Sequence, residues 1–247
     1  MINPGTHPNF KVTVITVVRN AEKVIHGLFD SVRNFKTNEV EFVVLDGLSE
    51  DNTVELIKKN EDIIDTWQSE PDKGIYDAMN KAVKLAKGEW LLFMGADDEL
   101  LEGFKQILPV LKEENTIYYG KVIFHDTIIT GKIKNNYMLT KTNICHQAIF
   151  YHRNVFSKYV YQTEYIKCAD YVLNLKLWDD PEFKFVYCDY LIANFPQGGF
   201  STYTEDPLFE KERGQLFKKY LKPMAYYRYL KKTLGIFKMF KRMLLNK

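Results

Sequence analysis

Residues 11–94 alternate four times between short apolar runs and helical segments, and this alternation constrains the fold more than any other feature. Apolar or β-branched runs of strand length occupy 11–18, 41–45, 63–67 and 90–94. The intervening segments read as helices, because 21–35 and 75–87 repeat apolar residues at three- and four-residue steps and 52–59 follows capping residues. Such alternation predicts a doubly wound α/β sheet. The run at 90–94 is apolar throughout, so we expect it to be covered on both faces.

Two adjacent carboxylates, Asp97 and Asp98, follow the apolar run at 90–94. In open α/β sheets ligands bind beyond the carboxyl ends of the strands. Carboxylates in that place are hard oxygen ligands suited to Mg²⁺ or Mn²⁺ with a phosphate-bearing substrate, although an Asp-Asp pair can also be a solvated turn. No Gly-x-Gly-x-x-Gly or Walker-type loop follows the first strand, which disfavours a dinucleotide enzyme or a P-loop kinase.

The regular alternation of strand and helix segments ends after Asp98. We expect a helix at 104–113, paired strands at 116–124 and 127–133, a helix at 171–177, a strand at 183–187 and helical structure from Phe209 onward. Gly88 stands where a left-handed helix C-cap belongs. These segments predict one domain over 1–205 and a basic amphipathic helical extension over 206–247.

Charge is distributed unevenly along the chain. Residues 218–247 hold ten of the 34 Lys and Arg residues and none of the 32 acidic ones, so 1–217 has a net charge of −8 although the whole chain is +2. Apolar and aromatic residues recur in this tail at helical spacing, which suits the interface of an anionic membrane. A helix packed on the body with a solvated basic face is the alternative. Nucleic-acid binding by the tail is a weaker hypothesis, and no nucleic-acid partner is expected.

Cysteine usage and hydropathy point to a cytoplasmic protein. Cys145, Cys168 and Cys188 are widely spaced and form no Cys-x-x-Cys pair, which argues against a disulfide framework or a structural zinc site. The first ten residues hold no apolar core of signal-peptide length, and no run of 18 apolar residues occurs.

Seven short motifs in a fixed order resemble those of the family 2 glycosyltransferases. They occupy 16–21, 44–53, 70–81, 95–98, 145–147, 169–171 and 198–201, so the resemblance covers about 10–202. It implies an inverting enzyme that uses a nucleotide-activated sugar. It also implies the GT-A fold, a three-layer sandwich around a mixed, mostly parallel sheet, with a donor half over 10–100 and an acceptor half over 101–205.

The resemblance also implies roles for residues of the donor half. Asp98 would be the direct ligand of a divalent metal, Mn²⁺ or Mg²⁺, and Asp97 would contact the ribose or that metal. Asp46 would hydrogen-bond the nucleobase or ribose, although a turn Asp is the structural alternative. The other donor-side candidates, each with an ordinary surface or helix-capping alternative, are Arg19 and Lys73 toward the diphosphate and Asp77 at a helix start.

Two further residues match the acceptor half of the family pattern. Asp170 corresponds to the catalytic base, which would take the proton of the acceptor hydroxyl, although it could instead be a helix N-cap. His146 corresponds to a residue on the acceptor or diphosphate side, with a satisfied core His as the alternative.

These implied roles predict transfer of a sugar, most simply from a UDP-sugar, to a hydroxyl of a glycan or lipid-linked acceptor in surface polysaccharide or lipopolysaccharide biosynthesis. The basic tail would hold such an enzyme peripherally on the inner face of the plasma membrane. A nucleotidyltransferase is one rival hypothesis, but the Gly-rich loop that it needs is missing after the first strand. A non-catalytic membrane scaffold that binds nucleotide sugars is the other.

Overall fold

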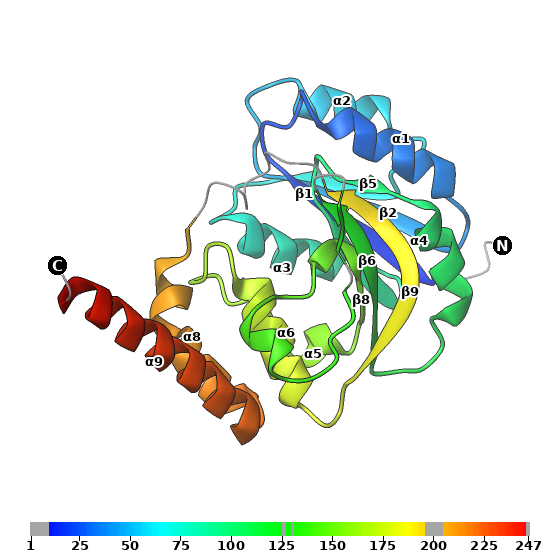
Figure 1. Ribbon diagram of the computed structural model, residues 1–247. Coiled ribbons are helices and arrows are strands. Elements are labelled where there is room, and N and C mark those ends of the chain that lie inside the picture. The colour runs from blue at the N-terminus through cyan, green and yellow to red at the C-terminus, as the bar shows by residue number, and fades with distance from the viewer. Residues whose placement is uncertain (1–9, 125–126, 130, 196–204, 246–247) are drawn as a thin grey trace.

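The computed structural model describes residues 10–124, 127–129, 131–195 and 205–245, which form a nine-stranded sheet flanked by helices (Figure 1). The strand order is β3-β2-β1-β4-β8-β6-β9-β5, with β7 paired to β6. The strands are β1 Val12–Val18, β2 Val40–Asp46, β3 Thr66–Ser69, β4 Trp90–Met94, β5 Glu99–Leu100, β6 Thr116–Phe124, β7 Thr127–Ile129, β8 Ile149–His152 and β9 Lys184–Phe195.

Helices connect these strands and extend the chain beyond them. The α-helices are α1 Ile25–Phe35, α2 Thr53–Lys59, α3 Ile75–Leu85, α4 Glu102–Ile107, α5 Val155–Lys158, α6 Ala169–Asp179, α8 Pro207–Tyr220 and α9 Pro223–Leu245. Short 3₁₀ turns are η1 Leu108–Val110, η2 Met138–Thr140 and η3 His146–Ala148.

The first four strands are parallel and end at one edge of the sheet. Val18 of β1 is level with Asp46 of β2, and Thr16 of β1 is level with Met94 of β4. Beyond β4 the sheet becomes mixed, because β8 runs antiparallel to both β4 and β6, whereas β6 and β9 are parallel. The carboxyl ends of β1, β2 and β4 therefore meet where the sequence predicts a ligand site.

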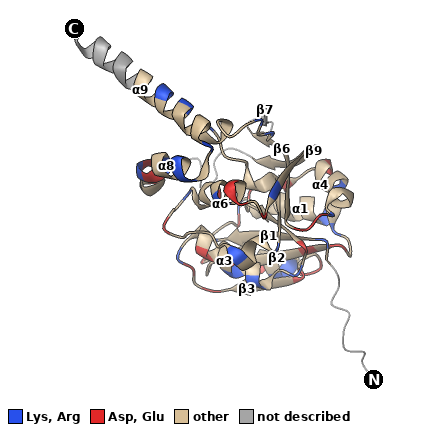
Figure 2. Ribbon diagram, turned by 90° about the horizontal axis from the view of Figure 1, so that it is seen from below, with Lys and Arg blue, Asp and Glu red and all other residues tan. Residues whose placement is uncertain are grey.

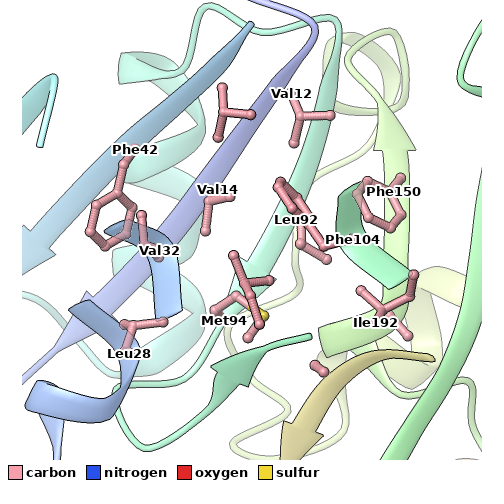
Figure 3. Packing of buried hydrophobic residues seen from close by; sticks show 14 of the residues in the cluster. Val12, Val14, Leu28, Val32, Phe42, Leu92, Met94, Phe104, Phe150 and Ile192 are labelled. Carbon is pink, nitrogen blue, oxygen red and sulfur yellow. The ribbon is translucent and has the colours of Figure 1, made fainter. Parts of the chain in front are cut away.

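Successive residues of β4 feed two apolar clusters on opposite faces of the sheet. Leu92 packs in the cluster that includes Phe104 and residues of α1 and α4 (Figure 3). Phe93 packs in the cluster that includes Met79 of α3 and residues of α6. All five residues of β4 are buried, as expected for a strand covered on both faces. The predicted three-layer α/β architecture is confirmed.

Local departures from the sequence prediction have simple packing causes. The third strand begins at Thr66, because Ile63 and Ile64 precede it in a turn and are buried in the core. The predicted helix 104–113 is shorter, since α4 gives way to a 3₁₀ turn at Pro109, which has no N–H to continue the helix.

The prediction of a left-handed C-cap at Gly88 is wrong. The cap of α3 is Ala86, whose backbone is extended, and Gly74 is the glycine with positive φ among the described residues. Gly88 is needed for close approach instead, because a Cβ there would lie 2.5 Å from the backbone nitrogen of Thr13. Its own N–H donates to Thr13 Oγ1 at 2.8 Å.

Helices α8 and α9 follow the sheet and lie to one side of it, with α9 projecting as a long rod (Figures 1 and 2). Part of their contact with the body is a cluster of Leu139, Leu175, Phe217, Leu221 and Ala225. None of the helices within the described ranges combines the length and apolar character that a membrane span needs. The predicted loop at 197–201 lies outside the described residues.

Candidate active site

Four of the sequence-predicted site residues line one cavity of about 280 Å³. Asp97 and Asp98 follow β4, His146 opens η3, and Asp170 lies in the first turn of α6. The remaining lining residues are Ile75, Tyr76, Met79, Gly95, Asn143, Cys145, Gln147, Lys167, Cys168, Tyr171 and Phe195. Carboxylates from two distant segments of the chain therefore share one chamber with largely apolar walls.

Asp98 is fully buried and only half satisfied. Its Oδ2 accepts a hydrogen bond from the backbone N–H of Gly95 at 2.6 Å. Its Oδ1 is buried and has no hydrogen-bond partner among the described residues. Burial raises the pKa of Asp98 to about 6. The Gly95 N–H and the nearby His146 and Gln147 side chains favour the charged form and offset part of this rise. An unpaired carboxylate oxygen in such a place is costly unless a cation compensates it.

The surroundings of Asp98 fit a divalent cation that is shared with a ligand. Asp97 is adjacent and half-buried, and both carboxylates pack so closely against Gly95 that a Cβ there would lie 2.9 Å from Asp98 Oδ2. In the described part of the chain no three His, Cys, Asp or Glu side chains converge to hold a metal by themselves. Phosphate oxygens and water would complete the oxygen shell that Mg²⁺ and Mn²⁺ prefer.

Asp170 is buried at the start of α6, and three side chains contact it. Its Oδ1 lies 3.0 Å from the hydroxyl of Tyr76, and its Oδ2 accepts from Asn143 Nδ2 at 2.7 Å. His146 Nδ1 lies 3.5 Å from the same Oδ2. Burial works to lower the pKa of His146, but the hydrogen bond and charge of Asp170 and the charge of Asp98 outweigh it and raise that pKa.

Asp46 ends β2 and organises the turn that follows. It is fully buried, its Oδ2 accepts from Ser69 Oγ at 2.6 Å and from the Ser49 N–H at 3.1 Å, and Ser49 Oγ donates to its Oδ1. Arg19 follows β1 at the same sheet edge and is exposed. Neither residue is among the described residues that line the cavity.

Asp77 and Lys73 also lie outside the cavity lining of the described chain. Asp77 is in the first turn of α3, where its Oδ2 accepts from the backbone N–H of Lys73 at 3.0 Å and lies 3.2 Å from Lys81 Nζ. The Lys73 amide, the largest of these influences, and the Lys81 charge lower the pKa of Asp77. The Lys73 side chain is exposed.

Tyr76 and Asn143 line the cavity and contact Asp170, and sequence reasoning did not single them out. Tyr76 lies inside the motif at 70–81, but the motif by itself implied no role for this residue. Asn143 carried no local signal. Its place beside Asp170 follows from a contact between segments 27 residues apart.

The sequence of this chain matches a known protein family. The model of a family described as Glycosyl transferase family 2 matches residues 13–172. The chain belongs to this family. The matched range includes the four cavity residues Asp97, Asp98, His146 and Asp170.

Relatives of this family 2 glycosyltransferase span most of its length. A PGL/p-HBAD biosynthesis glycosyltransferase of Mycobacterium bovis is 33% identical over 217 residues, which cover 83% of each chain. WfgD of Escherichia coli is named a UDP-Glc:alpha-D-GlcNAc-diphosphoundecaprenol beta-1,3-glucosyltransferase. It is 25% identical over 197 residues, which cover 76% of this chain and 77% of WfgD. The expected enzyme class, a glycosyltransferase, is confirmed.

Solved structures share the fold of this glycosyltransferase. S. aureus TarS 1–349 in complex with UDP-GlcNAc matches with a TM-score of 0.66 and 17% identity over 85% of this chain and 71% of that one. Mannosyltransferase PcManGT from Pyrobaculum calidifontis, in complex with GDP-Man and Mn²⁺, matches with a TM-score of 0.61 and 16% identity. This chain covers 61% of PcManGT, and 84% of this chain is matched. The GT-A fold is thereby confirmed.

Proposed function

We propose that this glycosyltransferase moves a sugar, with inversion, from a nucleoside-diphosphate sugar to a hydroxyl of a glycan or lipid-linked acceptor in surface polysaccharide or lipopolysaccharide assembly. One observation carries the proposal: Asp97, Asp98 and Asp170 line the same cavity. A UDP-sugar is the preferred donor, which the name of WfgD and the UDP-GlcNAc complex of TarS support.

Asp170 is the general base of the proposed reaction. Its carboxylate takes the proton of the acceptor hydroxyl while that oxygen forms a bond to the anomeric carbon of the donor sugar. The bond from that carbon to the phosphate oxygen breaks, and its electron pair leaves with the nucleoside diphosphate. Attack from the face opposite the leaving group inverts the configuration at the anomeric carbon.

Asp98, with Asp97 beside it, is the proposed holder of a divalent cation, and its buried unpaired Oδ1 supports this role. Mn²⁺ or Mg²⁺ bound there would neutralise the charge that grows on the departing diphosphate. His146 contacts Asp170 from the same chamber and is proposed on the diphosphate or acceptor side.

The remaining donor contacts are proposed for residues outside the cavity lining. Asp46 lies at the end of β2 and is assigned to the nucleobase or ribose, directly or through the turn that it holds. The exposed side chains of Arg19 and Lys73 are assigned to the diphosphate, and Asp77 to the donor side through the loop before α3. Arg19 and Asp46 stand at the adjacent ends of β1 and β2, and β3, which precedes the loop with Lys73, ends level with Asp46.

Substitution of Asp170 tests the proposal. We expect Asp170→Asn to lower donor turnover at least about 10³-fold, because an amide cannot accept the acceptor's proton. The assay measures release of the nucleoside diphosphate from a panel of UDP-sugars with Mn²⁺ and candidate acceptors. Asp179→Asn is the matched control, since Asp179 lies in the same helix and is exposed. Wild-type turnover in Asp170→Asn would sink the mechanism, and metal-dependent binding without turnover by the wild type would favour a scaffold.

We further propose that α9 rests on an anionic membrane surface. Met224, Tyr227 and Leu234 are 69%, 61% and 59% exposed on it. The ribbon of α9 in Figure 2 is coloured for Lys and Arg but not for Asp or Glu along its described residues. Arg228, Lys231 and Lys232 line a surface hollow together with Tyr137, Met224 and Tyr227. Basic groups among exposed apolar and aromatic side chains suit lipid headgroups and would bring the cavity near a lipid-linked acceptor on the inner face of the membrane.

Removing two charges from α9 tests membrane binding. Each basic residue near an anionic surface contributes about 1 kcal/mol, so Lys231→Gln with Lys232→Gln should weaken binding roughly 30-fold. Co-sedimentation with vesicles containing phosphatidylglycerol measures it, and vesicles of phosphatidylcholine alone should bind neither form. The control pair, Lys58→Gln with Lys59→Gln, removes two adjacent exposed lysines from α2. Equal binding by both double variants would contradict the proposal.

A further inference from the structure

The carboxylate of Asp170 is held at both oxygens by groups from other parts of the chain. The hydroxyl of Tyr76, in the first turn of α3, lies 3.0 Å from Oδ1, although the two residues are 94 positions apart. Asn143, which precedes η3, donates from Nδ2 to Oδ2 at 2.7 Å. Two contacts on opposite oxygens fix the plane of a carboxylate as well as its position.

Asn143 is itself fixed from behind by a buried chain of hydrogen bonds. Its Oδ1 accepts from Asn174 Nδ2 at 2.9 Å, and Asn174 Oδ1 accepts from the hydroxyl of Tyr151 at 2.8 Å. Asn174 is 1% exposed and Tyr151 is fully buried. Because the Asn143 carbonyl oxygen is committed to Asn174, its amide hydrogens must point toward Asp170.

Tyr76 has one hydroxyl hydrogen and two acceptors that compete for it. The backbone oxygen of Lys167 lies 2.5 Å from Tyr76 Oη, closer than Asp170 Oδ1 at 3.0 Å. Oδ1 is therefore held by the weaker contact, whereas Asn143 and His146 both approach Oδ2. This asymmetry leaves Oδ1 the freer of the two oxygens to receive a proton from a substrate.

We infer that Tyr76 and Asn143 are positioning residues, which fix the plane of the Asp170 carboxylate and aim its Oδ1 at the acceptor hydroxyl. The inference rests on the proposed role of Asp170 as base. While Asp170 is ionised, the Tyr76 hydroxyl can donate to Oδ1, and when Oδ1 takes the proton, the Tyr76 hydrogen can turn to the Lys167 carbonyl oxygen and the new O–H can donate to Tyr76 Oη. Both states of Asp170 thus keep a complete set of hydrogen bonds.

The titratable groups that face Asp170 come from every element around it. They are Tyr76 of α3, Cys145 and His146 at η3, Tyr151 of β8, Tyr161, and Cys168 and Tyr171 at α6. Burial, and then the charge of Asp170 for most of them, raises the pKa of the tyrosines and cysteines. The pKa of His146 is raised as well, because the hydrogen bond and charge of Asp170 outweigh its burial, and His146 stays intact in the variants below.

Two variants with a matched control test the inference. Tyr76→Phe removes one donor and little volume. Asn143→Asp keeps the acceptor for Asn174 but puts an acceptor where Asp170 needs a donor. We expect kcat to fall about tenfold in Tyr76→Phe and on the order of a hundredfold in Asn143→Asp. The donor KM should stay unchanged in both variants. Tyr159→Phe, which removes a tyrosine hydrogen bond to Asp180 outside the cavity, should retain wild-type kcat.

The split between kcat and KM separates positioning from general structural support. A variant that only loosens the fold should raise the donor KM and lower the free energy of unfolding, whereas a base that is aimed wrongly lowers kcat alone. A fall in kcat that comes with an equal rise in the donor KM, or wild-type behaviour in both variants, would overturn the inference. Full activity in Asp170→Asn would overturn the proposed function as well, and this separates the two failures.

Discussion

At the scale of single residues, the site depends on a carboxylate that the fold does not satisfy. Asp98 is buried with one oxygen unpaired, and its pKa is raised to about 6. The unfolded chain would ionise the same group near pH 4. Between these two values the folded protein binds the proton more tightly, so the contribution of Asp98 to stability is present below pH 4 and is lost as the pH rises through 6.

The residue-scale prediction concerns Asp98→Asn in the presence of a chelator. A difference of about two pKa units corresponds to roughly 3 kcal/mol, because each unit is worth 1.36 kcal/mol. Between pH 4 and pH 7 the wild type should lose about that much free energy of unfolding as Asp98 ionises, whereas Asp98→Asn should not. The difference in unfolding free energy between variant and wild type should therefore change by about that amount, in favour of the variant. The buried amide adds an offset that does not depend on pH. Urea denaturation at four pH values measures the shift.

Asp179→Asn serves as control here too, because Asp179 is exposed. Its unfolding free energy should follow the wild-type pH dependence. If the curves for Asp98→Asn and wild type ran parallel across pH 4–7, the account of Asp98 as a strained, ionisable group would be wrong.

At the scale of elements, α8 joins the body through α6, the helix that carries Asp170. Phe209 of α8 is buried in the core cluster of the sheet and lies 5.0 Å, centroid to centroid, from Tyr171. Asp206, the N-cap of α8, accepts from the backbone N–H groups of Lys167 and Cys168 just before α6. The first helix of the predicted extension 206–247 therefore supports the entry into α6.

We predict that Phe217→Ala destabilises the whole protein by about 3–5 kcal/mol in a single transition, because a large buried ring leaves a cavity at the contact of α6, α8 and α9. Phe217 is 2% exposed and its ring meets Tyr171 and Tyr229. Chemical denaturation followed by tryptophan fluorescence and circular dichroism measures it. Tyr227→Ala, exposed on α9, should change stability by less than about 0.5 kcal/mol. Two separate transitions would instead mean that residues 206–247 unfold independently.

At the scale of the whole molecule, the parallel half of the sheet and the later strands meet at one cavity. Asp97 and Asp98 come from the end of β4, whereas Asp170 arrives after the chain has added β6 and β8 beyond it. A ligand that spans both walls binds the folded protein and not the unfolded chain. Donor binding should therefore raise the free energy of unfolding.

We predict that a nucleotide sugar raises the melting temperature strongly only when a divalent cation is present. A donor at 100 times its dissociation constant adds about 2.7 kcal/mol. For a chain of this length that corresponds to a shift of about 5–10 °C. Thermal denaturation with UDP-glucose, UDP-GlcNAc and GDP-mannose, each with Mn²⁺ or EDTA, measures the shift. Equal shifts with EDTA, or an undiminished shift in Asp98→Asn, would contradict the proposed cation site.

The sequence by itself determined the layered α/β fold, because strand and helix periodicity are local properties. The continuous apolar run at 90–94 becomes a strand buried on both faces, as predicted. Local patterns could not reveal β5 or β8, which are two and four residues long. They form by pairing with distant strands, β5 with β9 and β8 with β4 and β6. Gly88 likewise looked like a cap because its close contact with Thr13 is not local.

Short sequence motifs also named four of the residues that line the cavity: Asp97, Asp98, His146 and Asp170. Only the tertiary structure decided how they are used. Burial left Asp98 with an unpaired oxygen, and contacts across 27 and 94 residues set Asn143 and Tyr76 on the two oxygens of Asp170. The physical reason is that the chemical identity of a carboxylate is local, whereas its desolvation and hydrogen-bond partners come from distant segments.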